Sequence, residues 1–331
     1  MNTVAVIGFA QSGHSLTTSG VETLVPVIRD ALEDAGLAKQ EVGFWCSGSS
    51  DYLAGRAFSF VNAVDAIGAV PPISESHVEM DAAWALYEAY VKILAGEAET
   101  ALVYGFGKAS AGELSRVLAL QMDPYTAAPL WPDAVSVAAL QARLGLEAGL
   151  FTERDMATVA ARDQGGDVEA MLGRPYLSDP LRAHDVARVK DGAAAVVLAA
   201  GERARVQRER PAWISGFAHR VDPQGLGERD LTTVPSAIAA GHDAELDGDL
   251  DLVALHAPFT HQELLLRAAL GLPAEKIIPS DGNAMFSAGL SRIGVAAEQV
   301  MSGRANRVAG HATSGPALQQ NLVCVLSSGE A

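Results

Sequence analysis

Short runs of apolar residues alternate along the chain with longer segments of helical periodicity. The apolar runs have the length of buried strands, and we expect strands at residues 4–9, 42–46, 101–106, 193–199, 213–217, 252–256, 307–311 and 322–326. Small and branched residues cover at least one helical face in segments 21–35, 82–94, 233–241, 261–270 and 284–301. Strands that alternate with helices predict βαβ units around a buried sheet, so the fold class is α/β.

The order strand, helix, strand, helix, strand occurs before residue 110 and again after about residue 190, which predicts two similar halves. The stretch between them is irregular, and its prolines favour turns and loops, so we expect it to form a cap over a cleft. The predicted organisation is an N-terminal half over 1–110, a cap or loop insertion over 111–189 and a C-terminal half over 190–331.

Composition restricts the possible partners. With 331 residues and 49% hydrophobic content, the chain can bury a large core, which excludes a disordered protein. A formal charge of -16 leaves no broad basic face for nucleic acid or anionic lipid, and no apolar stretch approaches the roughly 20 residues of a membrane span. The N-terminal apolar run lacks a basic leader and is interpreted as a first strand. The two distant cysteines indicate a reducing compartment and make no zinc-ligand spacing. We therefore expect a cytoplasmic protein without a metal.

Five segments carry a more specific pattern when taken together. They are Glu79-Met80-Asp81-Ala82-Ala83-Trp84-Ala85-Leu86, Asp191-Gly192-Ala193-Ala194, His256-Ala257-Pro258-Phe259-Thr260-His261-Gln262-Glu263-Leu264, Pro279-Ser280-Asp281-Gly282-Asn283 and Gly310-His311-Ala312-Thr313-Ser314-Gly315. In this combination the chain resembles the thiolase superfamily, in particular the sterol-carrier-protein-x thiolases and the actinobacterial "lipid-transfer protein" thiolase-like branch. The resemblance implies a thiolase fold, in which two similar βαβαβ halves form a five-layered α-β-α-β-α core with an inserted cap.

The departures from the family pattern decide the expected chemistry. The position of the family's nucleophilic cysteine falls on Glu79, and the histidine of its Gly-His-Pro motif falls on Ala288. The family's aspartate after His256 is Ala257, whereas the histidine of the last loop is matched by His311. Cys46 lies on an earlier predicted strand, where a buried apolar role is expected. A carboxylate cannot replace a thiolate as nucleophile, but it can accept a proton.

The resemblance therefore suggests retro-aldol cleavage of a β-hydroxyacyl-CoA without a cysteine nucleophile, as described for relatives that act on steroid side chains. Glu79 would be the base, His256 an oxyanion donor and His311 an acid–base group. The predicted substrate-binding residues are Asp81, Asn283 and Tyr125. Coenzyme A would enter only as part of the acyl-CoA substrate, and no permanently bound cofactor is expected.

Other interpretations remain open. Glu79 could simply cap the helix that follows it, and His256 could be a structural histidine. The whole chain could be a catalytically silent subunit of an acyl-CoA enzyme complex, or a lipid or acyl-CoA carrier. The family implies a homodimer or a heterodimer with another thiolase-fold chain, for which strand 101–106 is a candidate seam. It also implies an OB-fold/zinc-ribbon protein as a partner.

Overall fold

The computed structural model describes residues 3–14, 17–51, 58, 60–68 and 72–330. Its centre is a nine-stranded mixed sheet with the strand order β3-β2-β4-β7-β1-β8-β11-β10-β9. The strands of this sheet are β1 (Val4–Gln11), β2 (Phe44–Gly48), β3 (Glu75–Val78), β4 (Thr100–Gly107), β7 (Gly192–Ala200), β8 (Ala212–Val221), β9 (Leu252–Ala254), β10 (Arg307–Ser314) and β11 (Gln320–Ser327). A small second sheet pairs β5 (Tyr176–Ser178) with β6 (Leu181–Arg182). The α/β class and each of the strands expected from the sequence are confirmed.

Helices pack on both outer sides of this sheet, and two further helices pack between its two halves. Helices α1 (Gly20–Ala35), α3 (Val61–Ile67) and α9 (Gly201–Gln207) pack on one outer face, and α10 (Pro235–Asp243) and α11 (Thr260–Leu270) pack on the other. Helices α4 (Ala82–Leu94) and α12 (Ala288–Met301) share a core with both halves of the sheet. The arrangement is therefore a five-layered α-β-α-β-α stack, and the five predicted helices are present.

Alternation along the strands explains the layers. On β1, Val4 and Val6 face the central helices, whereas Ala5 and Ile7 face α1. Successive side chains of a strand point to opposite faces of the sheet, so strands with apolar residues at every position bury both faces. This is why the sequence shows continuous apolar runs rather than an alternation of apolar and polar residues.

The two halves of the sheet meet where β1 pairs with β8. Only two residue pairs join these strands, Ala5 with Trp213 and Val6 with Ala212. Strand β7 lies between β4 and β1, so a strand that follows the cap in sequence completes the sheet that the first residues begin. The segment boundaries expected at 110 and 190 stay a prediction. The candidate seam is wrong, because β4 is paired on both sides, by β2 and β7, and presents no free edge.

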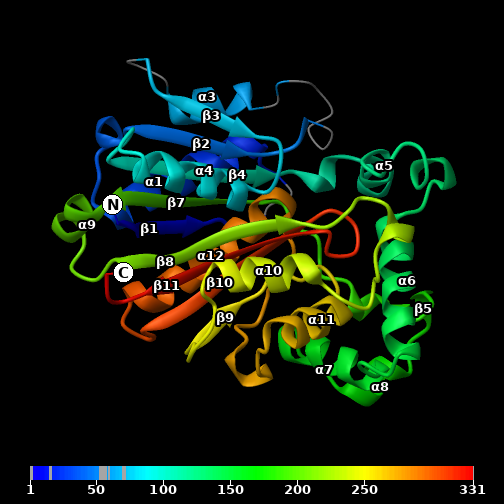
Figure 1. The fold of residues 1–331 in the computed structure, drawn as a ribbon. Helices are drawn as coiled ribbons and strands as arrows, with labels where there is room; N and C mark the ends of the chain where they lie inside the picture. Colours follow the sequence, from blue (N-terminus) through cyan, green and yellow to red (C-terminus); the bar gives the residue numbers. More distant parts are fainter. Residues whose placement is uncertain (1–2, 15–16, 52–57, 59, 69–71, 331) are drawn as a thin grey trace.

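The segment between the halves is more regular than its prolines suggest. It contains α5 (Leu114–Leu120), α6 (Ala134–Glu147), α7 (Glu153–Gln164) and α8 (Val168–Leu172), which Figure 1 shows gathered at one end of the molecule. Side chains cap α6 and α7: Asp133 accepts from the Ser136 N–H at 2.8 Å, and Thr152 caps α7. Turns of 3-10 helix complete the chain at η1 (Lys39–Glu41), η2 (Ala109–Ala111), η3 (Ala128–Leu130), η4 (Ala183–Asp185), η5 (Leu226–Glu228), η6 (Ala274–Lys276) and η7 (Met285–Ser287).

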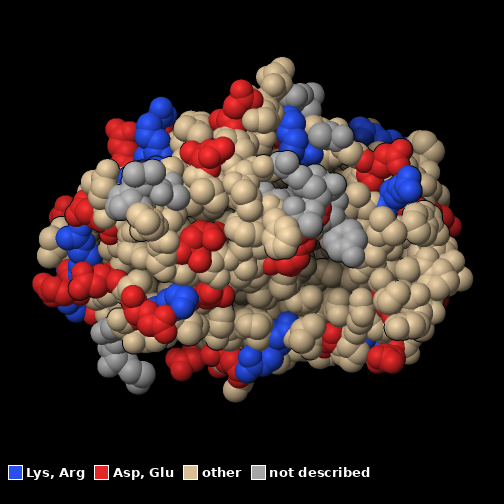
Figure 2. All heavy atoms as spheres, turned by 90° about the horizontal axis from the view of Figure 1, so that it is seen from above, with Lys and Arg blue, Asp and Glu red and all other residues tan. Residues whose placement is uncertain are grey.

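One face of the molecule can be judged for its distribution of charge. On the face that Figure 2 shows, acidic and basic side chains are scattered among uncharged ones, without a broad basic area. Within the described part of the chain, no helix combines the length and the apolarity that crossing a bilayer requires.

Candidate functional site

A cavity of about 710 Å³ lies between the cap and the central helices. Its cap side is formed by apolar residues of α5 and α6, and its other walls come from the turn before α4, the loop after β9 and the hairpin between β10 and β11. Its lining includes Glu79, Asp81, Ala138, Gln224, His256, Phe259, Gln262, Asn283 and Thr313. A concave space lined mostly by apolar residues, with a few polar groups, has the character of a small-molecule site.

Asp81 joins the two central helices at this cavity. It is the N-cap of α4, where its carboxylate accepts from the Ala83 N–H at 2.8 Å. The same carboxylate accepts from Gly289 N–H at 2.7 Å and Leu290 N–H at 3.1 Å, in the first turn of α12. Burial raises the pKa of Asp81 to about 7, although the three N–H donors lower it. These contacts give Asp81 a structural role, and substrate binding by it stays a prediction.

Glu79 lies at the mouth of the cavity, just after β3. Its side chain is 47% exposed. One oxygen accepts from the Asp51 N–H at 2.6 Å, and the other lies 3.4 Å from His77 Nε2. His77 in turn places Nδ1 3.0 Å from the Ser47 hydroxyl. Glu79 therefore does not cap α4, and its carboxylate is held open to solvent and cavity, where it can accept a proton.

His256 presents a hydrogen-bond donor to the cavity. The residue is 8% exposed, and its Nδ1 accepts from the Thr313 N–H at 3.4 Å. A backbone N–H can only donate, so the proton of the neutral ring sits on Nε2. Burial, and next the neighbouring His311, lower the pKa of His256 to about 3 against an opposing effect of Asn283. Nε2 is buried and has no hydrogen-bond partner among the described residues, so this N–H is available to a ligand oxygen.

His311 lies behind this wall and does not line the cavity. It is 1% exposed on β10, and its Nε2 is 3.0 Å from Asn321 Oδ1. The Asn321 amide donates to the Leu318 carbonyl at 2.8 Å and to the Ser236 hydroxyl at 2.7 Å, which fixes Oδ1 as the acceptor. Burial lowers the pKa of His311 to about 4. His311 therefore does not contact the cavity, and the structure does not support the acid–base role predicted for it.

The remaining predicted residues lie in different surroundings. Asn283 lines the cavity at 9% exposure, and its Oδ1 accepts from the Met285 N–H at 2.9 Å. Tyr125 is 89% exposed and does not line the cavity. The structure therefore brings together Glu79, Asp81, His256 and Asn283, and leaves Tyr125 and His311 outside.

No thiol reaches the cavity. Cys46 on β2 and Cys324 on β11 are both fully buried, and neither lines the cavity. Burial raises the pKa of each thiol well above its usual value. Ala288, at the position of the family's Gly-His-Pro histidine, also lies outside the cavity lining. Thiolate attack of the usual kind has no residue to perform it here.

Among the polar lining residues that were not predicted from the sequence, two have a distinct place in the site. Thr313 orients His256, and Gln262, in the first turn of α11, lines the cavity at 3% exposure. Gln262 lies six positions after His256, in the same segment of the family pattern, and this position could have indicated it as a site residue. Burial also lowers the pKa of His261, to about 3. We call His256, His261 and His311 the buried histidine trio.

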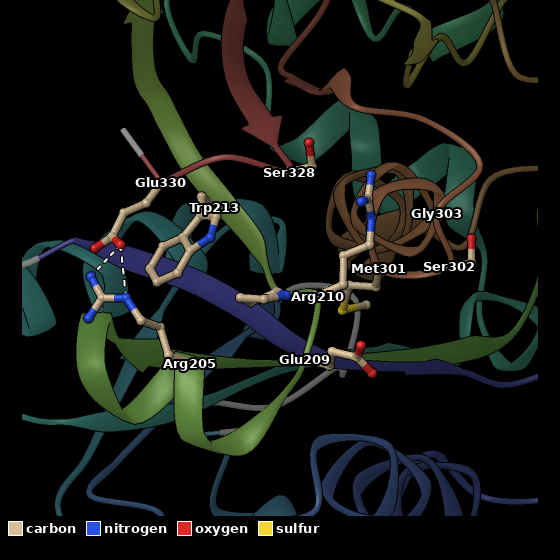
Figure 3. Close-up of a pocket in the computed structure, with 10 residues that line it drawn as sticks. Arg205, Glu209, Arg210, Trp213, Met301, Ser302, Gly303, Ser328 and Glu330 are labelled. Carbon is tan, nitrogen blue, oxygen red and sulfur yellow. Dashed lines mark hydrogen bonds and ion pairs between the residues drawn. The ribbon is translucent and has the colours of Figure 1, made fainter.

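A second hollow lies at the other end of the molecule, near both chain termini (Figures 1 and 3). Its arginines have partners: Arg205 pairs with Glu330, and Arg210 donates to the Val300 carbonyl at 2.7 Å. It therefore lacks the unpartnered buried donor that distinguishes the cavity beside the cap. The cavity beside the cap differs in charge, because no lysine or arginine is among the described residues that line it.

Comparison with known proteins agrees with this architecture. No protein-family profile matches the chain. Over 132 residues it is 31% identical to the acetyl-CoA acetyltransferase of Methanothermobacter thermautotrophicus, a match that covers 38% of this chain and 33% of that protein. The chain thus matches only about a third of the length of that curated relative.

Three solved structures match over almost their whole length. They are the Ltp2-ChsH2(DUF35) aldolase (TM-score 0.80, 17% identity, 98% of each chain), the Bacillus anthracis acetyl-CoA acetyltransferase (0.81, 17%, 99% of each) and the human mitochondrial 3-ketoacyl-CoA thiolase (0.79, 15%, 99% of each). The chain therefore has the thiolase fold, as the sequence resemblance implied. Identities this low establish the fold alone.

Proposed function

We propose that this protein cleaves the carbon–carbon bond of a β-hydroxyacyl-CoA in a retro-aldol reaction that uses no cysteine nucleophile. The observation that carries the proposal is the buried Nε2–H of His256, which has no partner among the described residues and lines the same cavity as the Glu79 carboxylate. Neither cysteine shares that cavity. A base and an oxyanion donor without a nucleophile fit a cleavage that needs no covalent intermediate.

The proposed steps balance without a further reactant. Glu79 removes the proton of the β-hydroxyl, and the bond between the α- and β-carbons breaks. The β-carbon becomes the carbonyl of the leaving aldehyde or ketone, and the electron pair moves into the thioester as an enolate. The His256 Nε2–H donates to the enolate oxygen, and the protonated Glu79 returns its proton to the α-carbon. The products are an aldehyde or ketone that carries the rest of the acyl chain, and the CoA thioester of the fragment that contains the α-carbon and the carbonyl carbon.

His256 suits the donor role because it stays uncharged. With a pKa of about 3, its ring is neutral across the physiological range and keeps its proton on Nε2. A fixed neutral donor in a site that excludes water stabilises developing negative charge without reorganisation, and loss of one such donor typically lowers kcat about 10²–10³-fold. From its place behind His256, we assign His311 to positioning rather than to contact with substrate.

The proposed substrate and partners are inferred from the proteins to which this chain is similar. An acetyl-CoA acetyltransferase and a 3-ketoacyl-CoA thiolase are named for acyl-CoA chemistry, and the name of the aldolase joins two components. We extend these features to this chain as a CoA thioester substrate that supplies the only coenzyme, with a lipid or steroid side chain as its acyl group. Pairing with a second thiolase-fold chain and with an OB-fold/zinc-ribbon protein belongs to the same proposal.

A silent subunit is the second candidate. It is favoured by the lack of a cation among the described lining residues, since the phosphates of CoA need positive charge nearby. In that case the chain would complete or stabilise an active partner. The two candidates differ in whether the Glu79 carboxylate takes part in turnover.

One experiment separates them. The purified protein, alone and with the products of neighbouring genes, is incubated with β-hydroxyacyl-CoA thioesters that carry linear, branched or steroidal chains, and carbonyl product is measured. The proposal expects product that is lost in Glu79→Gln and falls about 10²–10³-fold in His256→Ala. Full activity in Glu79→Gln complexes would assign the chemistry to the partner, and CoA-dependent thiolysis would overturn the proposal.

A further inference from the structure

Gln262 is a second buried residue with an unmet hydrogen-bonding atom at the cavity. It lies in the first turn of α11 and is 3% exposed. Its Oε1 is buried and has no hydrogen-bond partner among the described residues. Neither the retro-aldol base nor the oxyanion donor accounts for this acceptor, because both act on the reacting carbons.

The orientation of the Gln262 amide is fixed by its neighbours. Its Nε2 donates to Gln141 Oε1 at 3.1 Å. Gln141 cannot turn over, because its own Nε2 donates to the carbonyls of Leu231 at 3.1 Å and Ala317 at 3.4 Å. A flipped Gln262 would set two carbonyl oxygens against each other. His261 Nε2, at 3.3 Å from the same Gln141 oxygen, adds a further donor on that side. The oxygen of Gln262 is therefore held away from Gln141.

Apolar residues line the cavity beside the two elements that hold the Gln262 amide. Phe259, which precedes α11, and Ala138, one turn before Gln141 on α6, line the same cavity. An unpaired buried acceptor has lost its hydrogen bond to water, and a ligand donor would replace that bond. An apolar wall takes up the hydrocarbon part of a ligand, so the donor that meets Gln262 would be carried by the acyl group.

We propose that Gln262 is a specificity-determining residue whose Oε1 accepts a hydrogen bond from a hydroxyl group on the acyl chain, beyond the reacting carbons. The site would thus select acyl thioesters with a hydroxylated side chain over their deoxy analogues. This inference rests on the proposed function in one respect, namely that the ligand is an acyl-CoA thioester. It adds a second hydroxyl to the β-hydroxyl that the cleavage requires.

The test uses octanoyl-CoA and a set of its monohydroxylated forms with the hydroxyl at each carbon beyond the β position. Binding is measured by calorimetry on the full chain. One hydroxyl position should bind about 5–10-fold more tightly than octanoyl-CoA, the value of one recovered hydrogen bond. In Gln262→Met, of similar size, that preference should disappear, so that the hydroxylated form binds no more tightly than octanoyl-CoA. The exposed amide of Gln224, at the cavity mouth, provides the matched control: Gln224→Met should keep the preference.

The outcomes separate this inference from the proposed function. Octanoyl-CoA binding without preference for any hydroxylated form, or a preference that survives in Gln262→Met, overturns the role of Gln262 and leaves the retro-aldol proposal standing. Absence of all acyl-CoA binding, with and without partners, overturns both. Cleavage activity that depends on Glu79, together with a hydroxyl preference that depends on Gln262, supports both.

Discussion

Replacing Asp81 with alanine should destabilise the fold strongly, because one carboxylate serves the N-termini of both central helices. The N-cap contact to Ala83 is worth about 1 kcal/mol. The N–H groups of Gly289 and Leu290 would be left unpaired in the core, at about 1–3 kcal/mol each. Burial raises the pKa of Asp81 to about 7, so removing the carboxylate also relieves a desolvation cost. We expect a net loss of about 3 kcal/mol in the free energy of unfolding.

Urea denaturation followed by tryptophan fluorescence measures this loss, since the chain has four tryptophans. Asp133→Ala is the matched control, because Asp133 also caps a helix but serves only α6. It should cost about 1 kcal/mol. Equal losses in the two variants, or a loss below about 0.5 kcal/mol in Asp81→Ala, would show that the shared cap does not couple the central helices.

Three further predictions concern stability and reactivity. As the pH falls from about 6 to 4, the free energy of unfolding should fall by roughly 2–2.5 kcal/mol per pH unit. The buried histidine trio binds protons only after unfolding, whereas Asp81 releases one, so unfolding takes up about two protons net. A urea-titration series that is flat over this range would contradict this prediction. Gly105→Ala should lower the free energy of unfolding by about 1–3 kcal/mol in the same assay, since its β-carbon would lie 2.7 Å from the side chain of the first residue of α4. Gly227→Ala is the control and should be neutral, because the space around Gly227 is open. Cys46 and Cys324, fully buried, should react with an aromatic disulfide reagent only after unfolding, and rapid labelling of the native protein would refute the buried placement.

The sequence predicted those parts of the fold where pattern and propensity agree. The helix expected at 82–94 is observed as Ala82–Leu94, because its alanine-rich apolar run follows a capping aspartate. Strand β3 (Glu75–Val78) was not predicted, since its polar residues carry no apolar pattern and it forms through pairing with β2. Helix α6 (Ala134–Glu147) was hidden by the prolines that precede it.

The site was predicted less completely, because a strand position does not reveal what covers it. His311 and Thr313 lie on one face of β10, as residues two apart do. Thr313 reaches the cavity at the strand end, whereas Ser236 at the start of α10 joins the network that encloses His311. Gln262 was missed because the lack of a partner for its buried oxygen depends on the orientation of Gln141, which is distant in sequence. Contacts of this kind are set by tertiary packing alone.

The central claim is that the reaction proceeds without an acyl-enzyme. Protein mixed with β-hydroxyoctanoyl-CoA, together with its partners, can be quenched during turnover and its intact mass measured while carbonyl product is quantified in the same samples. We predict that product accumulates while the 34.4 kDa chain keeps its unmodified mass throughout. A chain that gains the mass of an acyl group, mapped to Cys46 or Cys324, would contradict the account.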